Sequence, residues 1–253
     1  MAQGNGLMFD AAVVTHQGHV RKLNEDSVFA NAQQGLWLVA DGMGGHRDGQ
    51  VASGLIADAA RKIAGSASLT ELAAHVRQQI DKVNGQLLGM SNGHDHMISG
   101  STVAALLIRD MEYCCLWAGD SRCYLMRDGR IQQVSRDHTE VQELVDRGTI
   151  TATEAKTWPR RNVITRAVGA DIDLVLEQAN GKVQPGDCFL LCSDGLTGHV
   201  DDQEILSVSN WSTAKNACDK LLELALERGG NDNISIIAVN AMMRMATVVV
   251  DKP

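Results

Sequence analysis
Four short apolar runs along the chain each end or begin beside an acidic residue. Three of them stop within two residues of Asp41, Asp120 or Asp194, and the fourth begins just after Asp232. Apolar runs of this length, bounded by turn residues, are typical of buried strands. We therefore expect each aspartate to lie where a strand meets a loop, a position that often carries binding and catalytic groups. The runs are residues 36–40, 114–118, 189–192 and 234–239.

Helical periodicity is found toward both ends of the chain. Apolar residues recur at helical spacing from Val51 to Ile63, and a second stripe follows Ser68, which forms an S-x-x-E capping box with Glu71. Two more helices are predicted at residues 201–208 and 212–228. Further strands are predicted at residues 9–15, 28–30, 101–108, 112–118, 122–126, 130–134, 174–178 and 188–192. Because helices bracket a run of strands, we expect an α+β protein whose sheets are covered on the outside.

The spacing of turn residues predicts how these strands pair. Strand 28–30 should pair with 36–40, and the four strands from residue 101 to residue 134 should form an antiparallel meander, with tight turns at Arg109-Asp110 and Asp128-Gly129. Residues 139–169 break this rhythm with a short helix and a polar stretch. We predict that they leave the core as a surface excursion, and long excursions of this kind are often functional.

Composition limits the domain count, the compartment and the partners. A chain of 253 residues is long enough for a sizeable core, so we expect one domain over residues 1–253. The net charge of -8 and the lack of a basic run argue against nucleic acid or an anionic membrane as a partner. Neither a membrane span nor a signal-peptide pattern is found in the sequence, which predicts a cytoplasmic protein.

The six cysteines predict buried, reduced thiols. They form no CxxC pair, and most of them fall inside strand-like apolar runs. We prefer this interpretation to a zinc site or a disulfide framework.

The acidic residues beside the strands form a candidate metal site. Carboxylates that converge on one point repel each other unless a hard cation neutralises them. No histidine or cysteine accompanies these acids at ligand spacing, and an oxygen-only set favours Mg²⁺ or Mn²⁺. Two ions about 3.5 to 4 Å apart would lower the pKa of a water between them and so provide a nucleophile for phosphorus. The residues are Glu25, Asp26, Asp41, Asp120, Asp194 and Asp232.

Two further residues fit this chemistry. Gly42 allows its backbone carbonyl to approach an ion closely, and the guanidinium of Arg21 can hold two phosphate oxygens at once. Taken singly, a D-G pair is usually a turn, and an N-D-N or G-D-S segment is usually a cap or a hairpin. Their joint occurrence beside buried strands favours the metal site, because acids in such positions need a compensating charge.

Five segments, in this order, resemble the motifs of the metal-dependent protein phosphatases of the 2C type. The resemblance extends from about Ala12 to Val239. The DGMGG form, together with the compact length, resembles the bacterial branch that opposes Hanks-type serine/threonine kinases. The segments are GHVRKLNED at 18–26, VADGMGG at 39–45, GDSR at 119–122, SDGL at 193–196 and DNIS at 232–235.

The resemblance implies a four-layer α-β-β-α sandwich, in which helices flank two antiparallel sheets and a dinuclear Mn²⁺ or Mg²⁺ centre lies at one end. Carried over to matching positions, Asp41 would bridge the two ions. Asp194 and Asp232 would complete the coordination of one ion, and Glu25 and the Gly42 carbonyl would help to hold the other. The excursion at 139–169 resembles a mobile flap near the active site.

Other matching positions receive supporting roles. Asp26 would orient waters on the ions, Asp120 would help Asp194 to hold a third, weaker ion, and Arg21 would bind the substrate phosphate. Animal relatives carry a histidine, a candidate general acid, where this chain has Met43, which has no proton to donate. The proton donor for the leaving alcohol therefore stays open between a water on the ions and the nearby His46.

His138 also matches a recurrent family position, and we expect a structural role for it, as we do for His46. The implied activity is the hydrolysis of phosphoserine and phosphothreonine in proteins. One alternative is another two-metal hydrolase, such as a phosphodiesterase or nuclease, against which the acidic charge counts. The other is a phosphoprotein-binding regulatory module of the same fold with weak or no turnover, against which the complete set of acids counts.

The expected partners are phosphorylated proteins, including a serine/threonine kinase and its substrates, and the expected oligomeric state is a monomer. Family examples of such pathways involve Hanks-type kinases, forkhead-associated proteins and a phosphorylation switch of type VI secretion. Nothing in the sequence selects one of them.

Overall fold
Two antiparallel sheets pack face to face in the computed structural model, which describes residues 7–44, 48–91, 100–209 and 213–243. In spatial order, the first sheet consists of β1 (Leu7–His16), β11 (Ile234–Met243), β10 (Cys188–Cys192), β7 (Arg122–Arg127) and β8 (Arg130–Gln133). The second consists of β2 (Asp26–Asn31), β3 (Leu36–Met43), β5 (Val103–Arg109), β6 (Glu112–Ala118) and β9 (Glu177–Lys182), with the short β4 (Gly100–Ser101) paired to β3.

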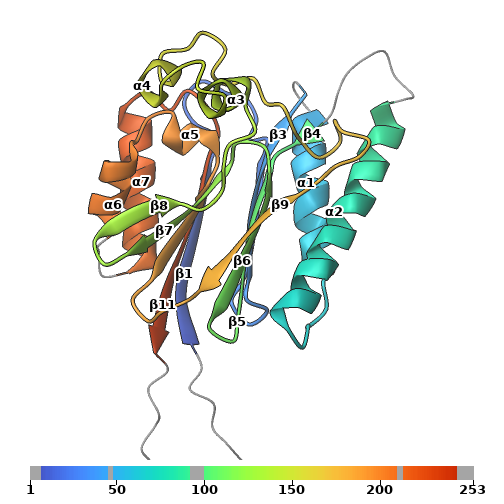
Figure 1. The fold of residues 1–253 in the computed structure, drawn as a ribbon, viewed down its shortest axis with the longest axis vertical. Helices are drawn as coiled ribbons and strands as arrows, with labels where there is room; N and C mark the ends of the chain where they lie inside the picture. The colour runs from blue at the N-terminus through green and yellow to red at the C-terminus, as the bar shows by residue number, and fades with distance from the viewer. Residues whose placement is uncertain (1–6, 45–47, 92–99, 210–212, 244–253) are drawn as a thin grey trace, which may run out of the picture.

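Helices cover the outer face of each sheet (Figure 1). The second sheet is covered by α1 (Asp48–Arg61) and α2 (Leu69–Ser91), and the first by α6 (Asp202–Ser209) and α7 (Ala214–Glu227). Three short helices, α3 (Glu140–Asp146), α4 (Ala152–Ala155) and α5 (Asp194–Thr197), lie at the end of the sandwich away from the outer ends of β1 and β11. The predicted α+β class and the four-layer α-β-β-α sandwich are confirmed.

The period-2 geometry of a strand explains the unbroken apolar runs. On β3, Leu36 and Leu38 face the layer of α1 and α2, whereas Trp37 and Val39 face the opposite sheet. Successive side chains point to opposite faces of a sheet, and here both faces are buried. The strands β5, β6 and β10 divide their side chains in the same way. Three apolar layers therefore hold the four structural layers together.

The predicted meander over residues 101–134 is wrong as a single sheet. The hairpins β5–β6 and β7–β8 are antiparallel as predicted, but β6 and β7 belong to different sheets. The chain crosses between the sheets just after Gly119, whose φ of 101° is in the region that favours glycine. An apolar run that is buried on both faces carries no sign of which sheet it joins.

Smaller corrections concern element boundaries. The first hairpin turns at Asp110 and Met111, both with positive φ, one residue later than predicted, whereas the turn at Asp128-Gly129 is as predicted. The strand predicted at 174–178 is instead β9, a polar edge strand with one exposed face. Residues 139–169 contain two short helices rather than one, and α5 was not predicted.

The capping box at the start of α2 forms only in part. Ser68 Oγ accepts a hydrogen bond from Glu71 N–H, at 3.1 Å, as predicted. The Glu71 carboxylate accepts from the N–H of Ala67, at 2.6 Å.

All six cysteines are buried and none forms a disulfide, as predicted. Burial raises the pKa of Cys114 to about 11, and burial raises the pKa of Cys188 and Cys218 to about 12. These thiols are therefore protonated and unreactive near neutral pH.

Candidate metal centre

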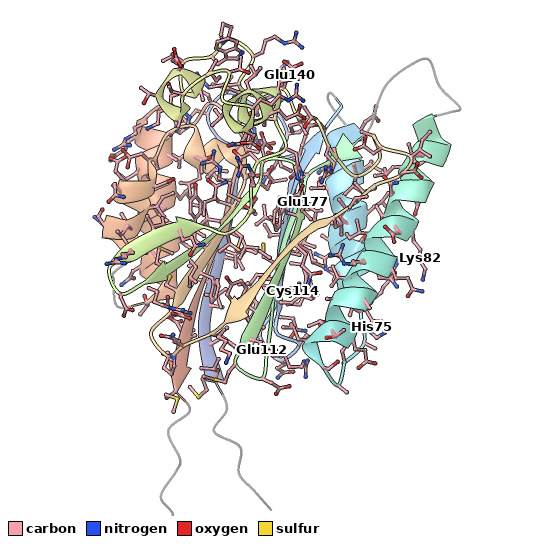
Figure 2. The ribbon with its side chains drawn as sticks, in the orientation of Figure 1. His75, Lys82, Glu112, Cys114, Glu140 and Glu177 are labelled. Carbon is pink, nitrogen blue, oxygen red and sulfur yellow. The ribbon has the colours of Figure 1, made fainter. Side chains whose placement is uncertain are left out.

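The predicted acids lie toward the end of the sandwich opposite the outer ends of β1 and β11. Glu112 and Cys114 mark the lower half of β6 in Figure 2, so this strand runs upward toward Asp120. Asp26 and Asp41 are directly paired residues on the neighbouring strands β2 and β3. Asp194 is the first residue of α5, immediately beyond β10, and Asp232 precedes β11. Residues at or beside strands of both sheets therefore place their carboxylates at one end of the molecule.

The adjacent residues Ser101 and Thr102 fix the backbone of Asp41. Its N–H donates to Thr102 Oγ1 at 3.0 Å, and its carbonyl accepts from Thr102 N–H at 2.8 Å and from Ser101 Oγ at 2.9 Å. The Thr102 hydroxyl also lies 2.7 Å from that of Ser121, the residue after Asp120. A hydrogen bond between two buried hydroxyl groups therefore links the residues that position Asp41 and Asp120.

Gly42 and Glu25 meet at the start of α1. Gly42 N–H donates to the Glu25 carbonyl at 3.1 Å, and Ser53 Oγ donates to the same carbonyl at 2.5 Å. A Cβ added to Gly49 would lie 2.6 Å from Glu25 Oε1 and 2.8 Å from the Gly42 carbonyl oxygen. Gly49 therefore leaves room for two oxygens that approach the same point, a role that no local sequence pattern indicates.

Asn233 ties the loop before β2 to the start of β11. Its side-chain oxygen accepts from Glu25 N–H at 2.8 Å, and its amide nitrogen donates to the carbonyls of Gln17 and Leu23 at 2.8 and 2.9 Å. On the same loop, Arg21 Nη2 donates to Asp232 Oδ2 at 2.6 Å.

Ser193 connects Asp26 to β11 by hydrogen bonds. Its hydroxyl donates to Asp26 Oδ2 at 2.8 Å and accepts from Ser235 N–H at 3.0 Å. The sequence motifs contain both Ser193 and Asn233, but only their distant partners reveal what they hold in place.

Burial and mutual repulsion raise the pKa values of these carboxyl groups. Burial, opposed by hydrogen bonds from Ser235 and Ser193, raises the pKa of Asp26 to about 7. Burial and the charge of Asp194 raise the pKa of Asp120 to about 8. Burial, and then the charges of Asp26 and Asp194, raise the pKa of Asp41 well above its ordinary value. The acids are therefore close enough to oppose each other's ionisation.

The pKa of Asp194 is raised as well, by burial and then by the charge of Asp232. A bound cation would lower the pKa of each of these carboxyl groups, because it favours the ionised form.

The donor set suits Mg²⁺ or Mn²⁺. Asp26 Oδ1 and Asp120 Oδ1 are buried and have no hydrogen-bond partner within the described part of the chain, which is costly for carboxylate oxygens unless a cation faces them. All the donors are oxygens, which these ions prefer. No three His, Cys, Asp or Glu side chains in the described residues already stand as a closed ligand set. The carboxylates would have to close further around an ion.

Residues 15–235 match the family described as protein phosphatase 2C. This chain belongs to that family.

Individual members of the 2C family agree with this assignment. The serine/threonine protein phosphatase PstP of Mycobacterium tuberculosis is 37% identical over 241 residues, which are 93% of this chain but 46% of PstP. The chain thus spans about half of the length of that relative. The structure of PppA, described as a key regulatory component of T6SS in Pseudomonas aeruginosa, has a TM-score of 0.85 and 41% identity, with 92% of this chain and 98% of PppA covered.

A metal-bound structure is also among the similar ones. The catalytic domain of PstP in complex with two manganese ions has a TM-score of 0.81 and 34% identity, with 94% of this chain and all of that chain covered. The oxygen-only site described above is consistent with a family in which such ions are bound.

Met43 ends β3 and packs near Gly100, and His46 lies outside the described residues.

Among the described helices, none is long and apolar enough to cross a membrane.

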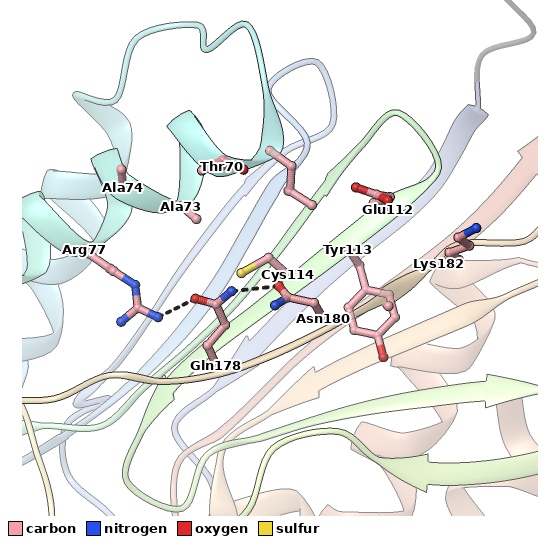
Figure 3. A pocket seen from close by; sticks show the side chains of 12 residues that line it. Thr70, Ala73, Ala74, Arg77, Glu112, Tyr113, Cys114, Gln178, Asn180 and Lys182 are labelled. Atoms are coloured by element: carbon pink, nitrogen blue, oxygen red, sulfur yellow. Dashed lines mark hydrogen bonds between the residues drawn. The ribbon is translucent and has the colours of Figure 1, made fainter.

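A groove elsewhere on this 2C-family chain lacks the metal-site chemistry. It has a volume of about 650 Å³ and lies between α2 and the strands β6 and β9 (Figure 3). Arg77 donates to Gln178 Oε1 at 2.7 Å, and Gln178 donates to Asn180 Oδ1 at 2.9 Å. None of the candidate carboxylates lines this groove. We therefore locate the candidate site by its converging carboxylates rather than by its concavity.

The pKa of Asp120 predicts a pH-dependent effect of Asp120→Asn. A carboxyl with a folded pKa of about 8 and an unfolded pKa of about 4 binds more protons in the native state between these values. Its contribution to stability is therefore lost as pH rises from about 4 to 8. In EDTA, we expect Asp120→Asn to melt at a higher temperature than wild type at pH 8, with little difference at pH 4. Melting curves at both pH values test this, and an equal difference at both would contradict it.

Proposed function
We propose that this chain is a metal-dependent protein serine/threonine phosphatase that hydrolyses phosphoserine and phosphothreonine. The convergence of buried carboxylates with raised pKa values in a chain of the 2C family carries the proposal. The chain covers about half of PstP, so the activity is proposed for this chain and not carried over from the whole of that relative. We propose that residues 1–253 form a single phosphatase domain.

For the ligands, we propose the set that the resemblance to the 2C family implies. Asp41 would hold both ions, Asp194 and Asp232 would help to hold one of them, and Glu25 and the Gly42 carbonyl would help to hold the other. Two divalent ions held there would neutralise the carboxylates and would lower the pKa of a water, which would supply the nucleophile for phosphorus. The sequence resemblance adds Asp120 and Asp194 as holders of a third, weaker ion.

Arg21 binds the substrate phosphate in this proposal. Its guanidinium lies 2.6 Å from Asp232 Oδ2, so it already reaches an oxygen at the edge of the site, and its side chain is half exposed. A phosphate presents oxygens in a similar arrangement, and a guanidinium can hold two of them at once. We propose that Arg21 exchanges its contact with Asp232 for the phosphate and thereby orients it.

Asp26 orients the water. Its Oδ2 accepts from Ser193, so the carboxylate is fixed, whereas its Oδ1 has no hydrogen-bond partner among the residues that the structure describes. That oxygen can accept a hydrogen bond from a water at the site and so orient it.

The physiological setting is proposed from the resemblance to the bacterial branch of the family. We propose that the substrates are phosphorylated proteins, that a Hanks-type serine/threonine kinase is the opposing enzyme in a bacterial cytoplasm, and that the chain acts as a monomer. The 139–169 segment, which lies above the site, would serve as the flap that selects substrates. The similarity to PppA makes control of type VI secretion the first pathway to test.

One experiment tests the reaction and its metal together. Phosphate release from a phosphothreonine peptide is measured with added Mn²⁺ and again after EDTA. We expect release only with Mn²⁺, and none from a phosphodiester such as bis(p-nitrophenyl) phosphate. Release from the diester alone would favour the phosphodiesterase alternative. No release from either substrate by the folded protein, with retained phosphopeptide binding, would favour the regulatory module.

A further inference from the structure
His138 lies between the Asp120 turn and the base of the 139–169 segment. Its side chain is buried and only 8% exposed. Its ring stacks on Trp117, with the ring centroids 6.3 Å apart and the planes at 16°. Trp117 is itself fixed, because its indole N–H donates to the Arg136 carbonyl at 2.8 Å. The imidazole therefore has a defined orientation.

Two hydrogen bonds join His138 to Gly119, the residue before Asp120. Gly119 N–H donates to His138 Nδ1 at 3.1 Å, and His138 N–H donates to the Gly119 carbonyl at 3.0 Å. Gly119 has a φ of 101°, and a Cβ there would lie 2.6 Å from the Thr102 side chain. This crowded turn is therefore packed against Thr102 on one side and hydrogen-bonded to His138 on the other.

The other ring nitrogen faces an ion pair. His138 Nε2 lies 3.1 Å from Glu177 Oε1 and 3.2 Å from Arg166 Nη1, and Arg166 Nη1 donates to Glu177 Oε1 at 3.1 Å. Because Nδ1 accepts from Gly119, the neutral ring carries its proton on Nε2, where the acceptor is Glu177. Burial, and then the charge of Arg166, lower the pKa of His138, so the ring is neutral near pH 7.

The base of the 139–169 segment closes at the same residue. Thr165 N–H donates to the His138 carbonyl at 2.8 Å, Glu140 N–H donates to the Val163 carbonyl at 2.9 Å, and Thr139 pairs with Ile164 in a β-bridge. Figure 2 places Glu140 in the uppermost part of the molecule and Glu177 at the upper end of β9. His138 is therefore in contact with both ends of the segment and with the turn that carries Asp120.

We propose that His138 is a positioning residue, which fixes the Gly119–Asp120 turn for the cation bound by Asp120 and connects this turn to the base of the 139–169 segment. This inference rests on the proposed function, in which Asp120 is an ion ligand. When a hydrogen bond that holds a metal ligand in place is lost, the metal affinity typically falls by about 10- to 100-fold.

Two substitutions separate the two ring nitrogens. In His138→Asn, the amide oxygen can stand near the position of Nδ1 and accept from Gly119. In His138→Gln, the amide reaches the position of Nε2 and can donate to Glu177, but the acceptor for Gly119 is lost. The same two changes at His75 of α2, whose ring lies 3.1 Å from Ser66 Oγ, serve as matched controls.

Calorimetric titration with Mn²⁺ alone, without substrate, is the main measurement. We expect the weakest Mn²⁺-binding step to be about tenfold weaker in His138→Gln. In His138→Asn and in both His75 variants, it should stay within about twofold of wild type. Equal weakening in both His138 variants, or in neither, would overturn the proposal, because a purely structural role does not distinguish the two nitrogens.

A measurement on the unmodified protein covers the case in which a variant fails to fold. Long-range ¹H–¹⁵N NMR should show a neutral His138 with its proton on Nε2, and the Gly119 amide should exchange slowly with solvent. A proton on Nδ1 would overturn the proposal. Neither measurement depends on phosphatase activity, so a failure of the proposed reaction would be recognised separately.

Discussion
Asp41→Asn should reduce the turnover number on a phosphothreonine peptide by at least about a thousandfold at saturating Mn²⁺. An amide is neutral and cannot bridge two cations as a carboxylate does, so the nucleophile and the charge neutralisation would be lost together. Asp41 pairs with Asp26 in the sheet, and its backbone bonds to Thr102 involve no side-chain oxygen of Asp41. The backbone position of residue 41 should therefore be unchanged in the variant.

The same variant should retain or increase the stability of the metal-free protein. Burial and the neighbouring charges of Asp26 and Asp194 raise the pKa of Asp41, so its ionised form destabilises the native state. In EDTA near pH 7, we expect the melting temperature to equal or exceed that of wild type. Asp58→Asn, the same change at an exposed carboxylate of α1, should leave turnover unchanged. Substantial residual turnover in Asp41→Asn would refute the assignment of the bridging ligand.

Gly49→Ala should weaken Mn²⁺ binding by about 10- to 100-fold and reduce activity in parallel at limiting Mn²⁺. The added Cβ would lie 2.6 Å from Glu25 Oε1 and 2.8 Å from the Gly42 carbonyl oxygen, which is closer than real Cβ contacts. The Gly42 oxygen belongs to the backbone and cannot rotate away. One or both of the oxygens proposed for the second ion must therefore move. Mn²⁺ titration of the purified variant gives the affinity directly.

Gly54→Ala is the matched control on the same helix. A Cβ at Gly54 would meet no atom within 4 Å, so this change tests the helix alone. Alanine is favoured over glycine inside a helix by about 1 kcal/mol, and we expect Gly54→Ala to be as stable as wild type or slightly more stable, with unchanged Mn²⁺ affinity. If Gly49→Ala also bound Mn²⁺ normally, the space at Gly49 would not matter for the site.

The strands and most of the candidate acids could be predicted from the sequence because their signals are local. An apolar run that stops before Asp41 or Asp194 predicts that a buried strand ends there. Asp194 follows this pattern, one residue beyond β10, whereas β3 continues through Asp41 and ends at Met43. The fold class followed from the order of helices and strands. The identity of the sheet that each strand joins did not, because β6 and β7 carry apolar side chains on both faces whichever sheet they enter.

The supports of the site depend on contacts between distant residues, which local patterns do not contain. Thr102 bonds to Asp41 across 61 positions, Ser193 to Asp26 across 167, and Asn233 to Glu25 across 208. In the sequence, these are ordinary small polar residues that favour turns and caps.

The sequence by itself thus determined which acids are available, the oxygen-only chemistry and the strand ends that present them. Only the tertiary structure decided how they act on one another. The pKa of Asp120 is raised by burial and by the charge of Asp194, and the space at Gly49 is set by Glu25 and Gly42. Burial, Coulomb interactions and steric contact all depend on distances in space, and chain folding sets those distances between residues that are far apart in the sequence.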